Sequence, residues 1–141
     1  MTDHKVLVCG GRDYNNTAKI IEVLNKYKKE VANIKCIIEG GAKGADSGAA
    51  LYAIGYNIPS VRHPADWELH GKQAGILRNI EMLNMWEPDV VIAFPGGKGT
   101  AHMIKVAKDA NVTVVEVEDD QEENPQEGQI SPAEAGPPGS Q

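Results

Sequence analysis

The chain has 141 residues, a length typical of one domain, and a net charge of −6. Apolar residues make up 41% and charged residues 24%, which supports a packed core and excludes disorder of the whole chain. No apolar run reaches the roughly 18 residues of a membrane-spanning helix, and the run at 6–9 is too short for a signal peptide. Cys9 and Cys36 lie in apolar runs, so we expect reduced thiols in a cytoplasmic protein.

The acidity belongs to the end of the chain. Residues 118–141 hold seven of the 20 acidic residues and neither Lys nor Arg, which leaves 13 acids against 14 bases in residues 1–117. The same segment is rich in Pro and Gly, and Ile130 is its one large apolar residue. We therefore predict a domain over 1–117 and a disordered acidic tail over 118–141. The nearly neutral body disfavours nonspecific binding of nucleic acid.

Short β-rich runs alternate with longer helical patterns along residues 1–117. The runs predict strands over 5–9, 35–38, 58–62, 89–93 and 112–117. Between them, apolar residues recur at helical spacing in three stretches, each of which predicts a helix. The three stripes are Ile20, Leu24, Tyr27 and Val31; Ala45, Ala49, Tyr52 and Tyr56; and Ile76, Ile80 and Leu83. A fourth helix is predicted over 100–110, with Thr100 at or near its N-cap. The alternation predicts an α/β fold with a single Rossmann-like, doubly wound parallel sheet of about five strands flanked by helices.

The third predicted helix carries more apolar side chains than one sheet contact can bury. Met82, Leu83, Met85 and Trp86 fall on more than one of its faces. Exposed apolar patches tend to mark interfaces, so we expect a homo-oligomer, a dimer or larger.

Glycine-rich turns follow three of the predicted strands. They read Gly10-Gly11-Arg12-Asp13, Gly40-Gly41-Ala42-Lys43-Gly44-Ala45-Asp46 and Pro95-Gly96-Gly97-Lys98-Gly99-Thr100. Because parallel strands end on one edge of a sheet, the turns converge on one crevice, where backbone amides and helix N-termini suit a phosphate. One such turn is typical of any tight strand–helix connection, but three in register favour a ligand. Neither a G-x-G-x-x-G motif nor the Ser or Thr that completes a P-loop is present, which argues against an ordinary dinucleotide oxidoreductase and a Walker-type NTPase.

The connection over 63–75 is long and rich in functional groups. It offers Asp66 for a hydroxyl, Trp67 for stacking and Lys72 for a phosphate, and Arg78 with Asn79 follows at the start of a helix. The alternative, in which Trp67 caps the core and Arg78 makes a surface salt bridge, stays open. The spacing of His and Cys predicts no metal site.

Five ordered motifs over residues 5–117 resemble the YspA-like family, a cpYpsA-related branch of the SLOG superfamily to which the LOG and DprA proteins belong. The motifs are Val6-Leu7-Val8-Cys9-Gly10-Gly11-Arg12-Asp13, Gly40-Gly41-Ala42-Lys43-Gly44-Ala45-Asp46, Pro64-Ala65-Asp66-Trp67, Gly75 with Arg78-Asn79, and Phe94-Pro95-Gly96-Gly97-Lys98-Gly99-Thr100. The resemblance implies a Rossmann-like fold that binds nucleotides or nucleotide-derived ligands, such as phosphoribosyl or ADP-ribose-like compounds, at the glycine edge. It also implies a bacterial or phage protein.

One position departs from the LOG phosphoribohydrolases, which cleave the base from a nucleoside monophosphate. Their motif resembles Pro-Gly-Gly-x-Gly-Thr-x-x-Glu, and this sequence has Met103 where the Glu would stand. A thioether neither transfers a proton nor stabilises an oxocarbenium charge. We therefore expect binding, by a sensor or sequestering protein, ahead of N-glycosidic hydrolysis with Asp13, Asp46 or Asp66 as a relocated acid. Single-stranded DNA binding of the DprA type is the third alternative.

The predicted partner is thus a nucleotide-type small molecule, with no cofactor, no metal, no membrane contact and no assigned catalytic residue. The predicted ligand-binding residues are Gly10, Gly11, Arg12, Asp13, Gly40, Gly41, Ala42, Gly44, Asp46, Asp66, Trp67, Lys72, Arg78, Asn79, Pro95, Gly96, Gly97, Lys98, Gly99 and Thr100.

Overall fold

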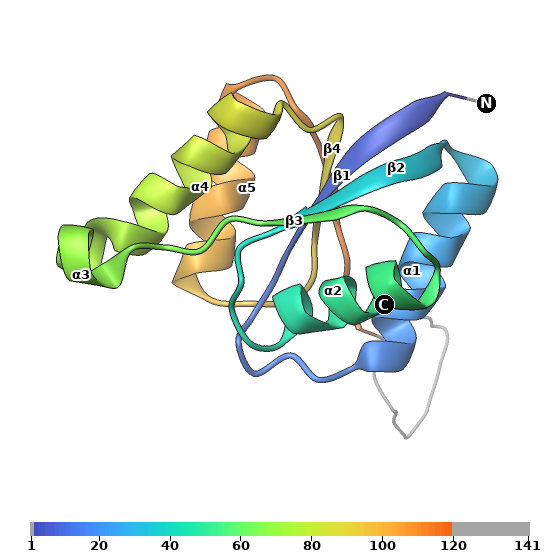
Figure 1. The fold of residues 1–141 in the computed structure, drawn as a ribbon, viewed down its shortest axis with the longest axis horizontal. Helices are drawn as coiled ribbons and strands as arrows, with labels where there is room; N and C mark the ends of the chain where they lie inside the picture. Colours follow the sequence, from blue (N-terminus) through green and yellow to red (C-terminus); the bar gives the residue numbers. More distant parts are fainter. Residues whose placement is uncertain (1, 120–141) are drawn as a thin grey trace, which may run out of the picture.

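The computed structural model describes residues 2–119, which form an α/β fold around one five-stranded parallel sheet (Figure 1). The strands lie in the order β3-β2-β1-β4-β5. Their bounds are β1 Asp3–Cys9, β2 Asn33–Glu39, β3 Ser60–Arg62, β4 Val90–Ala93 and β5 Thr113–Glu116. The Rossmann-like parallel sheet predicted from the sequence is confirmed. The tail predicted over 118–141 lies outside the described residues, apart from its first two.

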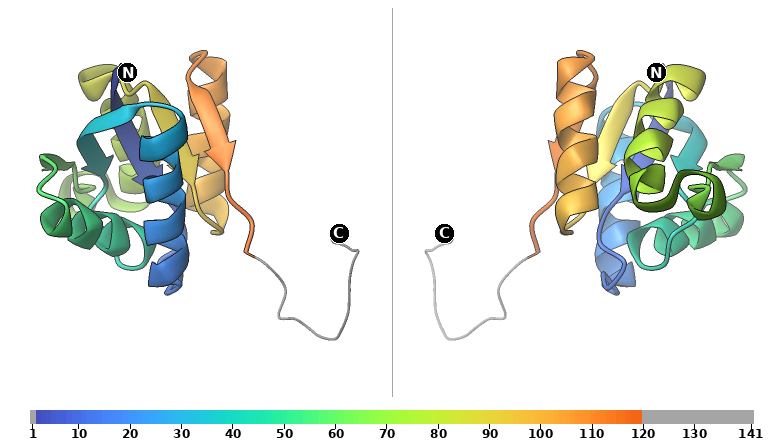
Figure 2. Two further views of the ribbon diagram at one scale, coloured as in Figure 1. Left: turned by 90° about the vertical axis from the view of Figure 1, so that its right-hand side faces the viewer. Right: turned by 90° about the vertical axis from the view of Figure 1, so that its left-hand side faces the viewer.

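Helices cover both faces of the sheet and give the domain three layers (Figures 1 and 2). Helices α1 (Thr17–Glu30) and α2 (Ala45–Gly55) pack on one face, and α4 (Ala74–Trp86) and α5 (Lys98–Asp109) pack on the other. The short helix α3 (Trp67–His70) and the 3-10 turn η1 (Gly71–Gln73) lead into α4. Among residues 2–119 there is no helix long and apolar enough to cross a membrane.

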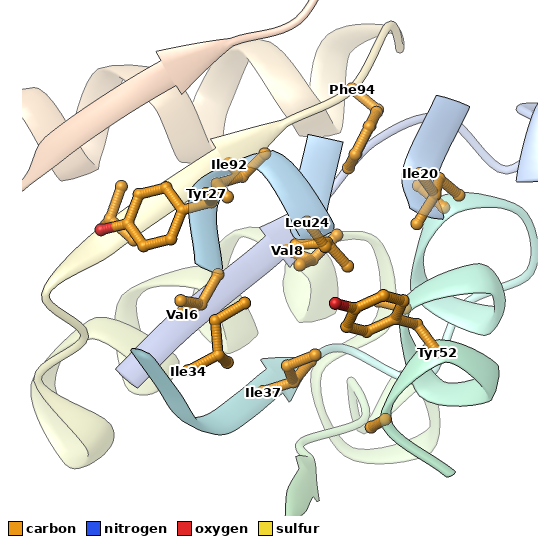
Figure 3. Close-up of a cluster of buried hydrophobic side chains, with 14 of the residues drawn as sticks. Val6, Val8, Ile20, Leu24, Tyr27, Ile34, Ile37, Tyr52, Ile92 and Phe94 are labelled. Carbon is orange, nitrogen blue, oxygen red and sulfur yellow. The ribbon is translucent and has the colours of Figure 1, made fainter. Parts of the chain in front are cut away.

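Strand β1 is buried on both faces because its side chains alternate between two apolar clusters. Val6 and Val8 pack with α1 and α2, as Figure 3 shows. Leu7, between them, packs with α4 and α5. All three side chains are fully buried. A central parallel strand covered by helices on both sides has no face toward water, which explains why the sequence of β1 is continuously apolar.

The strand order places a topological switch point between β1 and β4. The chain runs outward from β1 through β2 to β3, then returns to β4 beside β1 and continues to β5. The connections that leave the carboxyl ends of β1 and β4 therefore lead to helices on opposite faces. Such a divergence leaves a crevice at the carboxyl edge of the sheet.

Several boundaries differ from the sequence-based expectation. Helix α5 begins at Lys98 with Gly97 as its N-cap, so Thr100 lies inside the first turn instead of capping it. Helix α3 and η1 lie within the connection that was expected to be a loop, because elements of three or four residues show no periodicity. Val31, expected on the buried stripe of α1, is an exposed C-cap residue.

Candidate ligand-binding site

A cavity of about 360 Å³ opens at the carboxyl edge of the sheet, beside the switch point between β1 and β4. The elements that line it are the end of β1, the glycine turns after β1, β2 and β4, and the helices α2, α3, α4 and α5. Twelve of the predicted ligand-binding residues line this cavity. They are Gly10, Gly11, Arg12, Gly40, Ala42, Asp46, Trp67, Arg78, Asn79, Gly97, Gly99 and Thr100.

The other predicted residues lie near the cavity but outside its lining, and they are Asp13, Gly41, Gly44, Asp66, Lys72, Pro95, Gly96 and Lys98. Several of them have a structural task. Asp66 caps α3, because its Oδ1 accepts a 3.0 Å hydrogen bond from the N–H of Leu69. The carbonyl oxygen of Pro95 accepts a 2.9 Å hydrogen bond from the N–H of Gly11, which joins two of the glycine turns. Asp13, Lys72 and Lys98 are exposed.

The glycines of the three turns divide into two groups. Gly44 has φ of +78°, and a Cβ there would overlap the carbonyl oxygen of Gly11. A Cβ at Gly96 would overlap Thr100 and come within 2.7 Å of the Gly11 nitrogen. These glycines are needed because the turns pack against one another. Gly97 and Gly99 instead face open space within 4 Å and line the cavity, so their missing side chains leave room for a ligand.

Helix α5 presents a free N-terminus to the cavity. The N-cap residue Gly97 makes no side-chain cap hydrogen bond, and the first turn contains no acidic residue. The first N–H groups of a helix have no intrahelical acceptor, and together with the helix dipole they favour an anion. Because Gly97, Gly99 and Thr100 all line the cavity, this end of α5 suits a phosphate.

Two arginines add positive charge at the same cavity. Arg78 on α4 donates from Nη1 to the carbonyl oxygen of Gly40 at 2.8 Å and from Nε to Oδ1 of Asn79 at 3.1 Å. Burial lowers the pKa of Arg78, the nearby Asp46 carboxylate opposes this shift, and Arg12 adds to it. A guanidinium still carries its charge at neutral pH. Arg12 and Arg78 therefore form a pair of like charges that a bound anion would relieve.

Asn79 holds Arg78 against α5. Its side chain is buried, and its Nδ2 donates to the carbonyl oxygen of Gly99 at 3.3 Å and lies 3.1 Å from Nδ1 of His102. With Oδ1 accepting from Arg78, the amide connects the guanidinium to the first turns of α5. Asn79 therefore positions the two cationic features of the cavity relative to each other.

Asp46 is the acidic group of the cavity. Its Oδ2 accepts hydrogen bonds of 3.1 Å from the N–H groups of both Gly40 and Ala42, so it shapes the turn after β2. Burial raises the pKa of Asp46 from 3.8 to about 6, and the nearby Glu39 charge adds to the rise. The two amide hydrogen bonds and Arg78 oppose it.

Glu39 is a second buried carboxylate, and it is not among the residues predicted from the sequence. It is only 1% exposed, accepts a hydrogen bond from the N–H of Gly41 and pairs with Arg62 Nε at 2.9 Å. These contacts hold the turn after β2 in place, and Glu39 itself does not line the cavity. A charged residue at the end of an apolar strand, directly before two glycines, is the sequence signal that could have identified it.

Trp67 forms the outer wall of the cavity. Its side chain is 50% exposed, and the guanidinium of Arg12 lies 5.6 Å from the centre of its ring. The ring is thus held by a cation–π contact on one face, and half of its residue's surface remains accessible, which leaves room for stacking against a planar group.

The inner wall is apolar. It consists of Val8, Cys9, Met82 and Met103. Burial raises the pKa of the Cys9 thiol to about 12, and the Asp46 charge adds to this, so Cys9 is a protonated thiol at neutral pH and no ready nucleophile. Met103, at the position of the LOG glutamate, is fully buried in the cluster between the sheet, α4 and α5. Val8 and Met82 were not predicted to contact a ligand. In the sequence, an apolar residue of the inner wall looks the same as an apolar residue of the core.

The fold and the cavity define a Rossmann-like α/β protein with a strand-end pocket rich in glycine. Residues 4–70 match the model of the family described as "YspA, cpYpsA-related SLOG family". The gene 61 protein of Mycobacterium phage D29 is 36% identical over 118 residues, which cover 79% of this chain and 94% of the phage protein. The chain therefore belongs to the YspA, cpYpsA-related SLOG family, and the resemblance found in the motifs is confirmed.

Proposed function

We propose that the chain binds a nucleotide or nucleotide-derived ligand in this cavity and acts as a sensor or sequestering protein. The observation that carries the proposal is the meeting of Arg12, Arg78 and the uncapped N-terminus of α5 around one cavity. All three favour an anion. Family membership supports a nucleotide-related ligand. The exposed face of Trp67 supplies a stacking surface for a base.

The volume of the cavity favours a small ligand. At about 360 Å³ it lies near the lower end of the roughly 300–1,000 Å³ of small-molecule pockets. A mononucleotide fits this size better than a dinucleotide.

Calorimetric titration with 5′-nucleoside monophosphates, ADP-ribose and the matching nucleosides tests the proposal. A phosphate contact through Arg78 is worth about 1.5–3 kcal/mol. Arg78→Ala should therefore weaken binding of a monophosphate by about 10- to 100-fold and leave binding of the nucleoside nearly unchanged. Lys105→Ala is the matched control, because Lys105 is an exposed cation of α5 paired with Asp109. Equal affinity of wild type and Arg78→Ala for every phosphorylated ligand would overturn the proposal.

We propose binding without turnover, because a thioether stands at the position of the LOG glutamate and packs in the core. Chromatography of a bound monophosphate after long incubation should show no free base. Release of base by the wild-type protein would favour the phosphoribohydrolase alternative, with Asp46 as the carboxylate nearest the ligand.

We also propose a cytoplasmic homo-oligomer. In α4 the side chains of Met82 and Leu83 are buried in the core, whereas Met85, Ile76 and Ile80 are exposed. Ile76 and Ile80 are one helical turn apart and present an apolar strip to the outside.

A further inference from the structure

Asp46 has one carboxylate oxygen engaged and one free. The side chain is only 6% exposed and lines the cavity. Oδ2 accepts both turn amides. Within residues 2–119, no donor forms a hydrogen bond or close ion pair with Oδ1.

A buried carboxylate oxygen without a donor is costly, because the group is removed from water and gains nothing in exchange. The turn itself needs only Oδ2. The second oxygen is therefore available to a ligand, and an ionised carboxylate is a pure acceptor, so the ligand must donate. A phosphate alone does not meet this requirement, because at neutral pH it carries negative charge and repels the carboxylate.

The donor must lie close to the phosphate site. Gly40 marks the distance: a Cβ at this position would overlap the Arg78 guanidinium and lie 3.1 Å from Asp46 Oδ2. The cation and the carboxylate thus both lie close to the Cβ position of one glycine. A single small ligand that contacts both carries an anionic group and a hydroxyl a few bonds apart, as a sugar phosphate does.

We infer that Asp46 accepts hydrogen bonds from the ribose hydroxyls of the ligand, so that the site selects ribonucleotides over deoxyribonucleotides. This inference rests on the proposed function and names its ligand class. A site built to bind a hydroxyl rejects the analogue that lacks it, because the buried acceptor is then left unpaired. Asp46 is on this basis a specificity-determining residue.

The experiment compares AMP, GMP, CMP and UMP with their 2′-deoxy and 3′-deoxy forms by calorimetric titration of the full chain. For the base that binds best, removal of one of the two hydroxyls should weaken binding by about 10- to 100-fold in the wild type. Asp46→Asn should keep the turn, because the amide oxygen still accepts from Gly40 and Ala42. It should lower the ratio of ribo to deoxy affinity by about 10-fold, because a neutral N–H group then replaces the charged acceptor that faces the hydroxyl. Asp109→Asn, an exposed carboxylate at the end of α5, should keep the wild-type ratio.

The outcomes separate the two proposals. Equal wild-type affinity for the ribo and both deoxy forms, with Arg78→Ala still weakening each, overturns the role of Asp46 and leaves phosphate binding intact. A ratio that persists in Asp46→Asn also overturns it. Failure of all twelve compounds and of ADP-ribose to bind the wild type would overturn the inference and the proposed function together. The wild-type ratio needs no variant, so the test does not depend on how Asp46→Asn folds.

Discussion

Arg78 Nη1 donates a 2.8 Å hydrogen bond to the carbonyl oxygen of Gly40 and so joins α4 to the turn after β2. The same contact explains why residue 40 is glycine, because a Cβ there would overlap the guanidinium. Two motifs that are far apart in the sequence thus depend on each other. The bond leaves Nη2 of the guanidinium available, so the arginine can stay anchored while it contacts an anion.

The first prediction concerns Asn79, which positions Arg78. Asn79→Ala leaves Arg78 Nε, the Gly99 carbonyl oxygen and His102 without this partner, and should lower the free energy of unfolding by about 1–3 kcal/mol. It should also weaken binding of a nucleoside monophosphate by about 10-fold, because the guanidinium is no longer fixed. Urea denaturation and calorimetric titration measure the two effects. Asn84→Ala, an exposed position on the same helix, should change stability by less than about 0.5 kcal/mol.

The second prediction uses the open space at Gly99. A methyl group there meets no atom within 4 Å, and alanine favours the helix by about 0.5–1 kcal/mol, so Gly99→Ala should fold with unchanged or higher stability. The methyl group nevertheless enters the lining of the cavity and should weaken ligand binding by at least about 10-fold through steric exclusion. Gly55→Ala at the end of α2 also meets open space and lies away from the cavity, so its affinity should equal that of wild type. Unchanged affinity of Gly99→Ala would place the ligand elsewhere.

The sheet, its helices and the position of the cavity could be predicted, because periodicity and glycine turns are local signals. The roles of individual glycines could not. Gly96 and Gly97 are neighbours in the sequence, yet one packs against Thr100 and the other faces open space. Which of them leaves room for a ligand depends on how β1, β4 and α5 meet in space.

The roles of individual carboxylates could not be predicted from the sequence either. Asp46 and Asp66 were equal candidates by residue type and position. The structure buries Asp46 in the cavity wall and leaves Asp66 exposed as the N-cap of α3. The burial of Asp46 depends on tertiary structure, because it results from the packing of the start of α2 against the turn after β2. No local pattern distinguishes the two residues.

The third prediction locates the contact between copies of the chain. If the strip of Ile76 and Ile80 forms the interface, replacing both with lysine should reduce the mass in light scattering to that of one chain. The double variant Leu51→Lys and Ile54→Lys is the control, because it changes another exposed apolar pair, on α2. A monomer mass for the wild type at every concentration would remove the proposed oligomer. Dissociation by the control alone would move the interface to α2.

The fourth prediction concerns the end of the described chain. Tyr14, two residues beyond Arg12, donates a 2.7 Å hydrogen bond from its hydroxyl to Oδ1 of Asp119. A chain that ends at Asp119 should keep the wild-type melting temperature, because the composition of residues 120–141 offers little apolar surface to bury. A chain that ends at Val117 should melt a few degrees lower, and Tyr14→Phe in the longer chain should reproduce the loss. A decrease of several degrees on truncation at Asp119 would show that the acidic segment contributes to stability.

The last prediction follows from the raised pKa of Asp46. Burial raises it from 3.8 to about 6, so between these pH values the native state holds a proton that the unfolded state has lost. The free energy of unfolding contributed by Asp46 therefore falls as pH rises from about 4 to 6 and stays low above that range. The side-chain amide of the Asp46→Asn variant does not titrate and still accepts the two turn N–H groups. The stability of this variant relative to wild type should consequently increase by up to about 3 kcal/mol between pH 4 and pH 7. Urea denaturation at both pH values measures the difference, and Asp109→Asn, at an exposed site, should show almost none. An offset between Asp46→Asn and wild type that stays constant with pH would mean that the carboxylate titrates as it does in water.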